Sequence, residues 1–310
     1  MRATSMILGV RPDPSKLDPA EYAVWVAVNR GALDVAHDAL GRTCQTPADL
    51  LGALDGFRDR GNKAVLDVWF MLSNEATDAG FRGDSEALAK SGCALLKLGR
   101  AIPPHGTLVD HVMADSTQSS GVQRLARWRT TFDRVTCSNV LLHVLAHDAA
   151  QPEFKSVAAW ERYYSKRMSL IPSYFDGDTG FMWSEFCSAQ MPGTKYWRGV
   201  EDGISRHEQT TKRHSAELRL LALELALRLH SLDHGKPPGS LSELVPRYLA
   251  RLPADPFSTS GFIYRVAGTN WLAYSIGPDG KDDDGAPIPW PITGSPPKGD
   301  IVFTNRPPSR

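Results

Sequence analysis

Residues 217–238 read Glu-Leu-Arg-Leu-Leu-Ala-Leu-Glu-Leu-Ala-Leu-Arg-Leu-His-Ser-Leu-Asp-His-Gly-Lys-Pro-Pro, and this leucine-rich run predicts a long helix that ends at the Gly-Lys-Pro-Pro break. Charged residues recur within the run, at Glu217, Arg219, Glu224 and Arg228. A helix that spans a bilayer carries few or no charges over such a length. The run therefore predicts a helix that is buried inside a water-soluble protein.

A series of short motifs follows this helix. It comprises Leu241-Ser-Glu-Leu-Val-Pro-Arg-Tyr-Leu249, Leu252-Pro-Ala-Asp-Pro-Phe257, Phe262-Ile-Tyr-Arg265, Tyr274-Ser-Ile-Gly-Pro-Asp-Gly280 and finally Asp300-Ile301. In this order, the motifs resemble the globular part of the major pseudopilin of type II secretion systems, over roughly residues 215–303. The resemblance implies a long helix, a short helix, a small antiparallel sheet and a calcium loop that ends in Asp-Ile.

The segment that follows Tyr274 gathers negative charge. It contains Asp279, Asp282, Asp283, Asp284 and Asp300, with Lys281 and Lys298 as the only lysines beside them. Crowded carboxylates repel one another unless a cation or solvent absorbs their field, and oxygen ligands beside glycines favour calcium over zinc. The resemblance implies that Asp279 and Asp300 supply side-chain ligands, while the three consecutive aspartates either add an oxygen or are solvated. We therefore predict a structural Ca²⁺ site among these five residues.

The first two-thirds of the chain predicts one helix after another. Asp18-Pro19-Ala20-Glu21 and Thr46-Pro47-Ala48-Asp49 each place a capping residue and a proline before an apolar run, and Asp84-Ser85-Glu86 opens another helix. Further helices are expected at about 106–116, 120–136 and 138–148. Short Gly or Pro breaks between them favour antiparallel helical hairpins, with a repeat-like solenoid as an alternative.

The expected fold class is mainly α with a C-terminal α+β module, in which a helical-hairpin domain precedes a long helix packed on a small antiparallel sheet. The expected division is an extended segment at 1–16, a helical domain at 17–150, an aromatic-rich connection at 151–214 and the pseudopilin-like module at 215–310. Ala87-Leu-Ala-Lys-Ser-Gly-Cys-Ala-Leu-Leu-Lys-Leu-Gly-Arg100 and Leu108-Val-Asp110 are similar to an uncharacterised bacterial family with this two-part architecture.

The connecting region is rich in aromatic residues, because 11 of the 27 Phe, Trp and Tyr residues lie between Phe154 and Trp197. An aromatic cleft edged by carboxylates can bind a sugar or a peptide, and paired carboxylates can hydrolyse glycosides. The alternative is a core joint between the two parts of the protein. The candidate ligand-binding residues are Trp160, Tyr164, Tyr174, Asp176, Asp178, Trp183, Glu185 and Trp197.

Composition excludes several classes of protein. The 35 basic and 35 acidic side chains balance, so the chain has no electrostatic footprint for nucleic acid. An apolar share of 42% excludes general disorder. The four cysteines have no C-x-x-C spacing and predict buried thiols, with one or two disulfides left open. His143 and His147 stand four apart, but Val144 replaces the glutamate of a zinc-protease motif.

These patterns favour a non-enzymatic interaction or scaffold protein that is linked to a secretion-type or cell-envelope assembly. The alternative is a glycan- or peptide-binding protein, or a hydrolase, that uses residues 154–197. Residues 1–16 resemble neither a signal peptide nor a membrane span. The location stays open: extracytoplasmic, where calcium is plentiful, if an export signal lies upstream of Met1, and cytoplasmic otherwise.

Overall fold

The computed structural model describes residues 18–42, 57–102, 107–168, 195–289 and 296–303. The helices in these ranges are α2 (Pro19–Val28), α3 (Arg30–Leu40), α4 (Phe57–Arg82), α5 (Ser85–Ala101), α6 (Leu108–Trp128), α7 (Arg134–Ala149), α8 (Phe154–Met168) and α10 (Lys195–His234), with 3₁₀ turns η3 (Arg129–Thr131) and η5 (Leu241–Leu244). The strands are β1 (Ile263–Ala267), β2 (Asn270–Ser275) and β3 (Ile301–Val302). A mainly helical protein with a small antiparallel sheet near its C-terminus is therefore confirmed.

Two predicted helix starts are confirmed by their capping bonds. Asp18 Oδ1 accepts a hydrogen bond from the Glu21 amide at 2.9 Å, and the Glu21 carboxylate accepts one from the Asp18 amide at 3.4 Å. Asp84 caps α5 by accepting from the Ala87 amide at 3.0 Å. Each cap satisfies an amide that the helix leaves unpaired, and it is worth about 1 kcal/mol. The third predicted start, at residues 46–49, lies outside the described residues.

The predicted division of residues 106–148 into three helices was wrong. α6 runs unbroken from Leu108 to Trp128. The α-helical structure is interrupted only at residues 129–133, before α7 begins. Gly121 in α6 lies so close to α5 that an added Cβ would stand 2.8 Å from the carbonyl oxygen of Gly92. This close contact between helices holds a Ser-Ser-Gly stretch helical although its own helix propensity is low.

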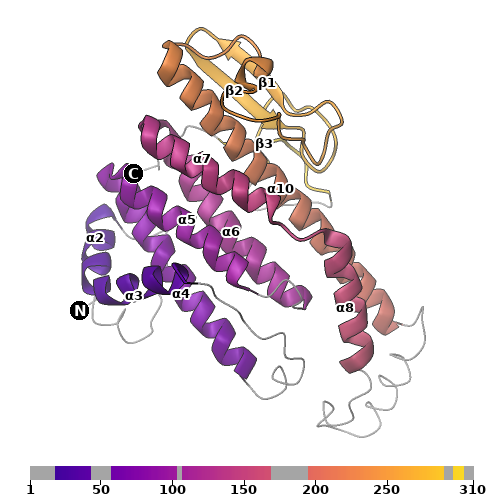
Figure 1. The fold of residues 1–310 in the computed structure, drawn as a ribbon. Helices are drawn as coiled ribbons and strands as arrows, with labels where there is room; N and C mark the ends of the chain where they lie inside the picture. Colours follow the sequence, from indigo (N-terminus) through magenta and orange to yellow (C-terminus); the bar gives the residue numbers. More distant parts are fainter. Residues whose placement is uncertain (1–17, 43–56, 103–106, 169–194, 290–295, 304–310) are drawn as a thin grey trace, which may run out of the picture.

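Two apolar cores hold the described helices together. The larger core joins α5, α6, α7, α10 and the sheet around fully buried residues such as Val122 and Leu221. The smaller core, which includes Trp25 and Leu33, fixes α2 and α3 on α4 and α5. In Figure 1, α2 and α3 lie at the end of the bundle that is remote from the sheet.

Two of the four cysteines fall within the described residues. Cys93 and Cys137 are free buried thiols, and burial raises the pKa of each to about 12. The prediction of buried thiols is confirmed for this pair. Cys44 and Cys187 lie outside the described residues.

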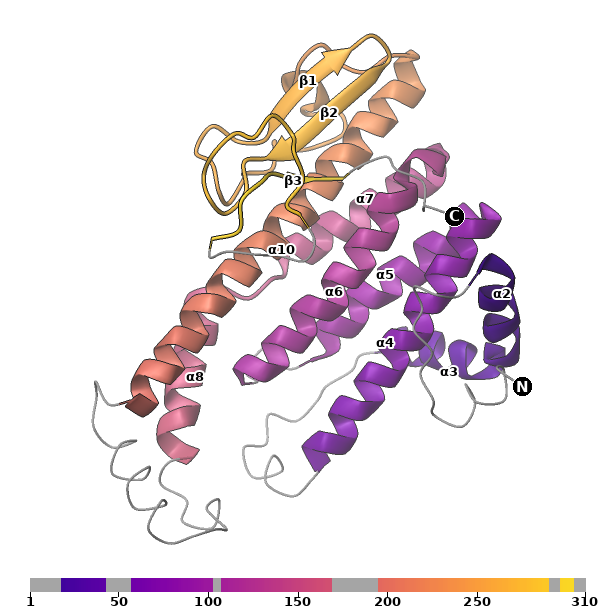
Figure 2. The same ribbon diagram turned by 180° about the vertical axis from the view of Figure 1, so that it is seen from behind.

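The long helix α10 is shared by the bundle and the sheet. It begins at Lys195, so the predicted boundary between residues 214 and 215 falls inside it. Figures 1 and 2 show α6 and α7 on one side of its C-terminal half and the strands on the other, while α8 runs beside its N-terminal half. Most side chains from Ala216 to Leu229 are less than 5% exposed. Because each fully buried leucine contributes about 2 kcal/mol, this segment is the main apolar link between the two layers.

None of the helices in the described residues combines the length and the apolar character that crossing a membrane requires.

The sheet has the strand order β1-β2-β3 and is antiparallel throughout. β1 and β2 form a hairpin in which Ile263 pairs with Tyr274 and Ala267 pairs with Asn270. β3 returns to β2 through the pairing of Ser275 with Ile301. The acidic segment is therefore the connection from β2 to β3, and both of its ends are fixed by strand pairing.

Candidate functional site

The acidic connection from β2 to β3 is shaped by glycines with positive φ. Gly277, Gly280 and Gly285 have φ angles of 70°, 67° and 81°. At Gly277 an added Cβ would stand 2.4 Å from the carbonyl oxygen of Gly299, so the two ends of the loop can approach only through a residue without a side chain. The loop is therefore folded tightly against the end of the sheet.

Asp300 lies at the centre of this loop and is only 1% exposed. Its Oδ2 accepts a hydrogen bond from the Gly285 amide at 2.7 Å, and its Oδ1 accepts a longer one from the Asp283 amide at 3.4 Å. Burial raises the pKa of Asp300, and the charges of Asp282 and Asp283 raise it further, while the two amides oppose the shift. Asp300 therefore organises the loop through its hydrogen bonds, although burial and its acidic neighbours disfavour its negative charge.

Asp282 and Asp284 are paired with residues of the strands. Asp282 Oδ1 accepts from the Tyr274 hydroxyl and from the Asp284 amide, both at 2.9 Å. Arg265 of β1 lies 3.4 Å from Asp282 Oδ2 and 2.9 Å from Asp284 Oδ1. Arg265 therefore joins the lysines as a balancing cation, which the sequence does not predict because nothing along the chain indicates that β1 lies beside this loop.

The remaining two aspartates lie at the surface side of the loop. Asp279 is half-buried and accepts from the Lys281 amide at 3.3 Å, and Asp283 is exposed. Within the described ranges, no three His, Cys, Asp or Glu side chains are already arranged around a metal position. The donors themselves are the carboxylate oxygens that calcium prefers, and buried Asp300 beside two other carboxylates is a place where a cation would lower the electrostatic cost.

The aromatic candidates are only partly described. Trp160 and Tyr164 lie one turn apart on α8, where the Trp160 ring is 5.2 Å from that of Tyr163, and Trp197 lies near the start of α10. The other five candidates, Tyr174, Asp176, Asp178, Trp183 and Glu185, lie outside the described residues. The predicted cleft therefore stays a prediction.

A buried ion pair joins the bundle, α10 and the sheet. Arg129 Nε donates to Glu224 Oε2 at 3.0 Å, and the two side chains are 5% and 3% exposed. The same carboxylate oxygen accepts from Trp271 Nε1 of β2 at 3.0 Å, and Arg129 also donates to the carbonyl oxygen of Phe303 at 3.0 Å. Four parts of the chain therefore meet in one hydrogen-bonded joint.

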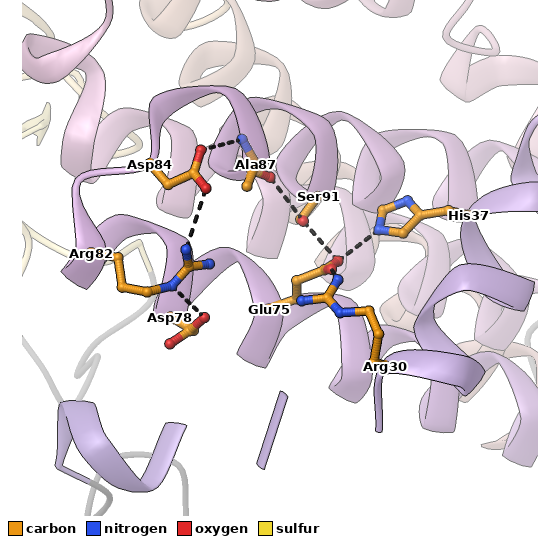
Figure 3. Close-up of polar contacts among 8 residues, drawn as sticks. All are labelled: Arg30, His37, Glu75, Asp78, Arg82, Asp84, Ala87 and Ser91. Carbon is orange, nitrogen blue, oxygen red and sulfur yellow. Dashed lines mark hydrogen bonds and ion pairs between the residues drawn. The ribbon is translucent and has the colours of Figure 1, made fainter. Parts of the chain in front are cut away.

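A second polar cluster fixes α3 to the bundle, as Figure 3 shows. Glu75 of α4 accepts from Arg30 at 2.7 Å, from Ser91 at 2.8 Å and bonds to His37 Nε2 at 2.6 Å. Burial alone would raise the pKa of Glu75, but the hydrogen bonds from His37 and Ser91 and the nearby positive charges hold the pKa below its usual value. No regular spacing along the chain connects these four residues, so the cluster is not visible in the sequence.

Buried histidines line the contacts of α10 with α6 and α7. His214 Nδ1 bonds to Ser119 Oγ at 2.9 Å, and burial lowers the pKa of His214 to about 4. Burial likewise lowers the pKa of His207 to about 4 and that of His147 to about 3. Beside His207, burial raises the pKa of Asp115 to about 6. His147 pairs with Gln151 rather than with His143, as expected of a packed histidine.

No protein-family model, curated protein or solved structure matches the chain. The pseudopilin-like module stays a prediction from the motifs quoted above.

Proposed function

We propose that this protein is a non-enzymatic scaffold that presents a pseudopilin-like C-terminal module on a helical base, in association with a secretion-type or cell-envelope assembly. The observation that supports this proposal most is the buried joint of Arg129 and Glu224, which also binds Trp271 and the carbonyl oxygen of Phe303. A protein that presents one module to a partner needs a fixed connection between module and base. Polar groups buried at the joint have specific partners, so they favour one relative arrangement.

A second clamp supports the same proposal at the far end of α10. Asp233 accepts two hydrogen bonds from Arg134 of α7, at 2.7 and 3.2 Å. It also accepts from Arg247 at 3.1 Å and from the Tyr248 hydroxyl at 2.9 Å. The hydrogen bond from Arg134, then that from Tyr248, holds the pKa of Asp233 below its usual value. The segment that leads to the sheet is therefore tied to both α7 and α10.

Calcium has a structural role in this proposal. Asp279 and Asp300 would hold the ion, with one of the three consecutive aspartates adding an oxygen. The ion would supply positive charge beside a buried carboxylate whose pKa is raised by burial and by its acidic neighbours. Binding would fix the connection between β2 and β3 and leave the rest of the module unchanged.

Calcium is expected to raise the thermal stability of the protein relative to a chelator. At a free concentration about 100-fold above the dissociation constant, the gain is about 2.7 kcal/mol. Asp300→Asn and Asp279→Asn should each lose most of this gain, because each removes a charged ligand. The matched control is Asp38→Asn, whose side chain is 65% exposed and pairs with Arg42 outside the acidic loop; it should keep the gain. The calcium role would be contradicted if calcium did not change the thermal stability of the wild type, or if it stabilised Asp300→Asn as much as the wild type.

The scaffold role is tested by chemical cross-linking of the full chain in cells, followed by identification of the cross-linked proteins. A component of an envelope assembly should be recovered with the wild type and with Asp38→Asn. If the acidic loop helps to present the C-terminal module to its partner, less cross-linked partner should be recovered with Asp300→Asn, although the purified variant stays folded. Hydrolysis of glycans or peptides by the purified wild type, abolished by Glu185→Gln without loss of folding, would instead establish the enzymatic alternative.

A further inference from the structure

The last turn of α10 carries two histidines on one face. His230 and His234 are four residues apart, and their ring centroids lie 4.3 Å from each other. Residues at positions i and i+4 of a helix are neighbours, so one cation can contact both rings without a change in the backbone. His230 is 7% exposed and is fixed by its surroundings, whereas His234 is exposed.

The hydrogen bond of His230 defines which ring nitrogen carries the proton. His230 Nδ1 lies 3.2 Å from the carbonyl oxygen of Lys236. A carbonyl oxygen can only accept, so Nδ1 must carry the hydrogen, and in the neutral ring Nε2 then has a free lone pair. Histidines that bind metals commonly donate their other N–H to a carbonyl or carboxylate in this way.

A carboxylate oxygen faces this nitrogen. Glu243 of η5 accepts from the Ser240 amide through Oε1 at 3.1 Å, which leaves Oε2 to face His230 Nε2 at 3.8 Å. This distance is too long for a hydrogen bond. Bonds of zinc to nitrogen and to a carboxylate oxygen are each about 2.1 Å long, so an ion slightly off the line between the two atoms reaches both.

From these contacts we propose that His230, His234 and Glu243 form a binding site for a transition-metal ion of the zinc class. Two imidazoles and one carboxylate are the ligands that such ions accept, in contrast to the oxygen ligands of calcium. Among the described residues no group of three such side chains could hold a metal ion as it stands, so the site requires His234 to rotate about its side-chain torsions.

The charges around this site are balanced by the clamp at Asp233. Arg134 and Arg247 are both paired with this carboxylate, and so their charges are partly offset near the histidines. Asp233 itself is occupied by these arginines and by Tyr248, and it therefore does not compete as a ligand. The bound ion would link the end of α10 to η5, on the path from the helix to the sheet. This site does not depend on the proposed scaffold role or on calcium binding.

The test is a titration of the metal-free protein, without an affinity tag, with Co²⁺ and then with Zn²⁺. The visible absorption of Co²⁺ should show nitrogen and oxygen ligation at one equivalent, and Zn²⁺ should displace it. His234→Ala should weaken binding at least about tenfold, because even the loss of a residue that only supports a ligand costs about 10- to 100-fold. His234 is exposed, so His234→Ala should keep the fold, and circular dichroism checks this.

The matched control is His143→Ala, which removes the exposed histidine of the other i, i+4 pair in the described helices. It should bind Co²⁺ as the wild type does. Glu243→Gln, which keeps an oxygen for the Ser240 amide, should also weaken binding. The proposal is overturned if the wild type binds neither ion, if His234→Ala binds as well as the wild type, or if His143→Ala loses binding to the same extent.

Discussion

Glu224→Gln is expected to lower the free energy of unfolding by about 3–5 kcal/mol, the cost of removing one partner of a buried ion pair. The substitution keeps the size of the side chain and an oxygen for Trp271, but it leaves the charge of Arg129 without its counter-ion at a side-chain exposure of 5%. Urea denaturation followed by far-ultraviolet circular dichroism measures the change. The metal content of the sample is kept constant, because the proposed calcium and zinc-class sites would contribute to stability independently of this ion pair.

The matched control for this experiment lies on the same helix. Glu201→Gln removes the same charge from an ion pair with Arg162 in which both side chains are 47% exposed. Exposed pairs contribute less than about 1 kcal/mol, because water screens the charges and the side chains lose freedom when they pair. If Glu224→Gln lowers the free energy of unfolding no more than Glu201→Gln does, the buried joint is not a source of stability.

His214→Asn is expected to reduce the acid sensitivity of the protein by about 3 kcal/mol between pH 6.5 and pH 4. The pKa of His214 falls from an ordinary value of 6.5 to about 4 in the folded protein. A histidine with a lowered pKa binds its proton more readily in the unfolded chain, so the stability is complete above pH 6.5 and is lost as the pH falls toward 4. A difference of 2.5 pKa units corresponds to about 3 kcal/mol. Asparagine keeps a group that can pair with Ser119 and does not titrate.

This experiment compares the pH dependence of two proteins because other buried groups act in the opposite direction. Burial raises the pKa of Asp115 to about 6, so ionisation of Asp115 lowers the stability of the folded protein as the pH rises from 3.8 to 6. This contribution is the same in both proteins and cancels in the difference. His234→Asn, at an exposed position of the same helix, is the control and should follow the wild type in the presence of a chelator. Parallel pH profiles for wild type and His214→Asn would contradict the prediction.

The sequence predicted those parts of the fold that depend on neighbours along the chain. Asp18 and Asp84 were found because a capping residue and the amide it pairs with are three positions apart. The resemblance carried by the motifs after residue 240 implied a small antiparallel sheet, but it gave neither the strand order nor the register. The continuity of α6 was missed, since it depends on the contact between Gly121 and α5, which local propensity does not contain.

The candidate sites were less predictable, because their members come from distant parts of the chain. Arg129 and Glu224 are 95 positions apart, and Arg129 and Phe303 are 174 apart. Arg265 was missed at the acidic loop for the same reason, although it is only 17 positions from Asp282. In contrast, the five aspartates were found because they are concentrated in one segment, and the spacing of His230 and His234 is visible in the sequence even though their partner Glu243 is not.

The shared position of α10 also has a consequence for the order in which the chain can fold during synthesis. α6 and α7 leave the ribosome first, but the apolar side chains that they turn toward α10 have no partner until Ala216–Leu229 has emerged. The strands follow α10 in the chain, so the helix on which they pack has already been synthesised when they emerge. We therefore expect the nascent chain to expose this apolar surface until α10 has emerged, and chaperones that bind such surfaces to act on it.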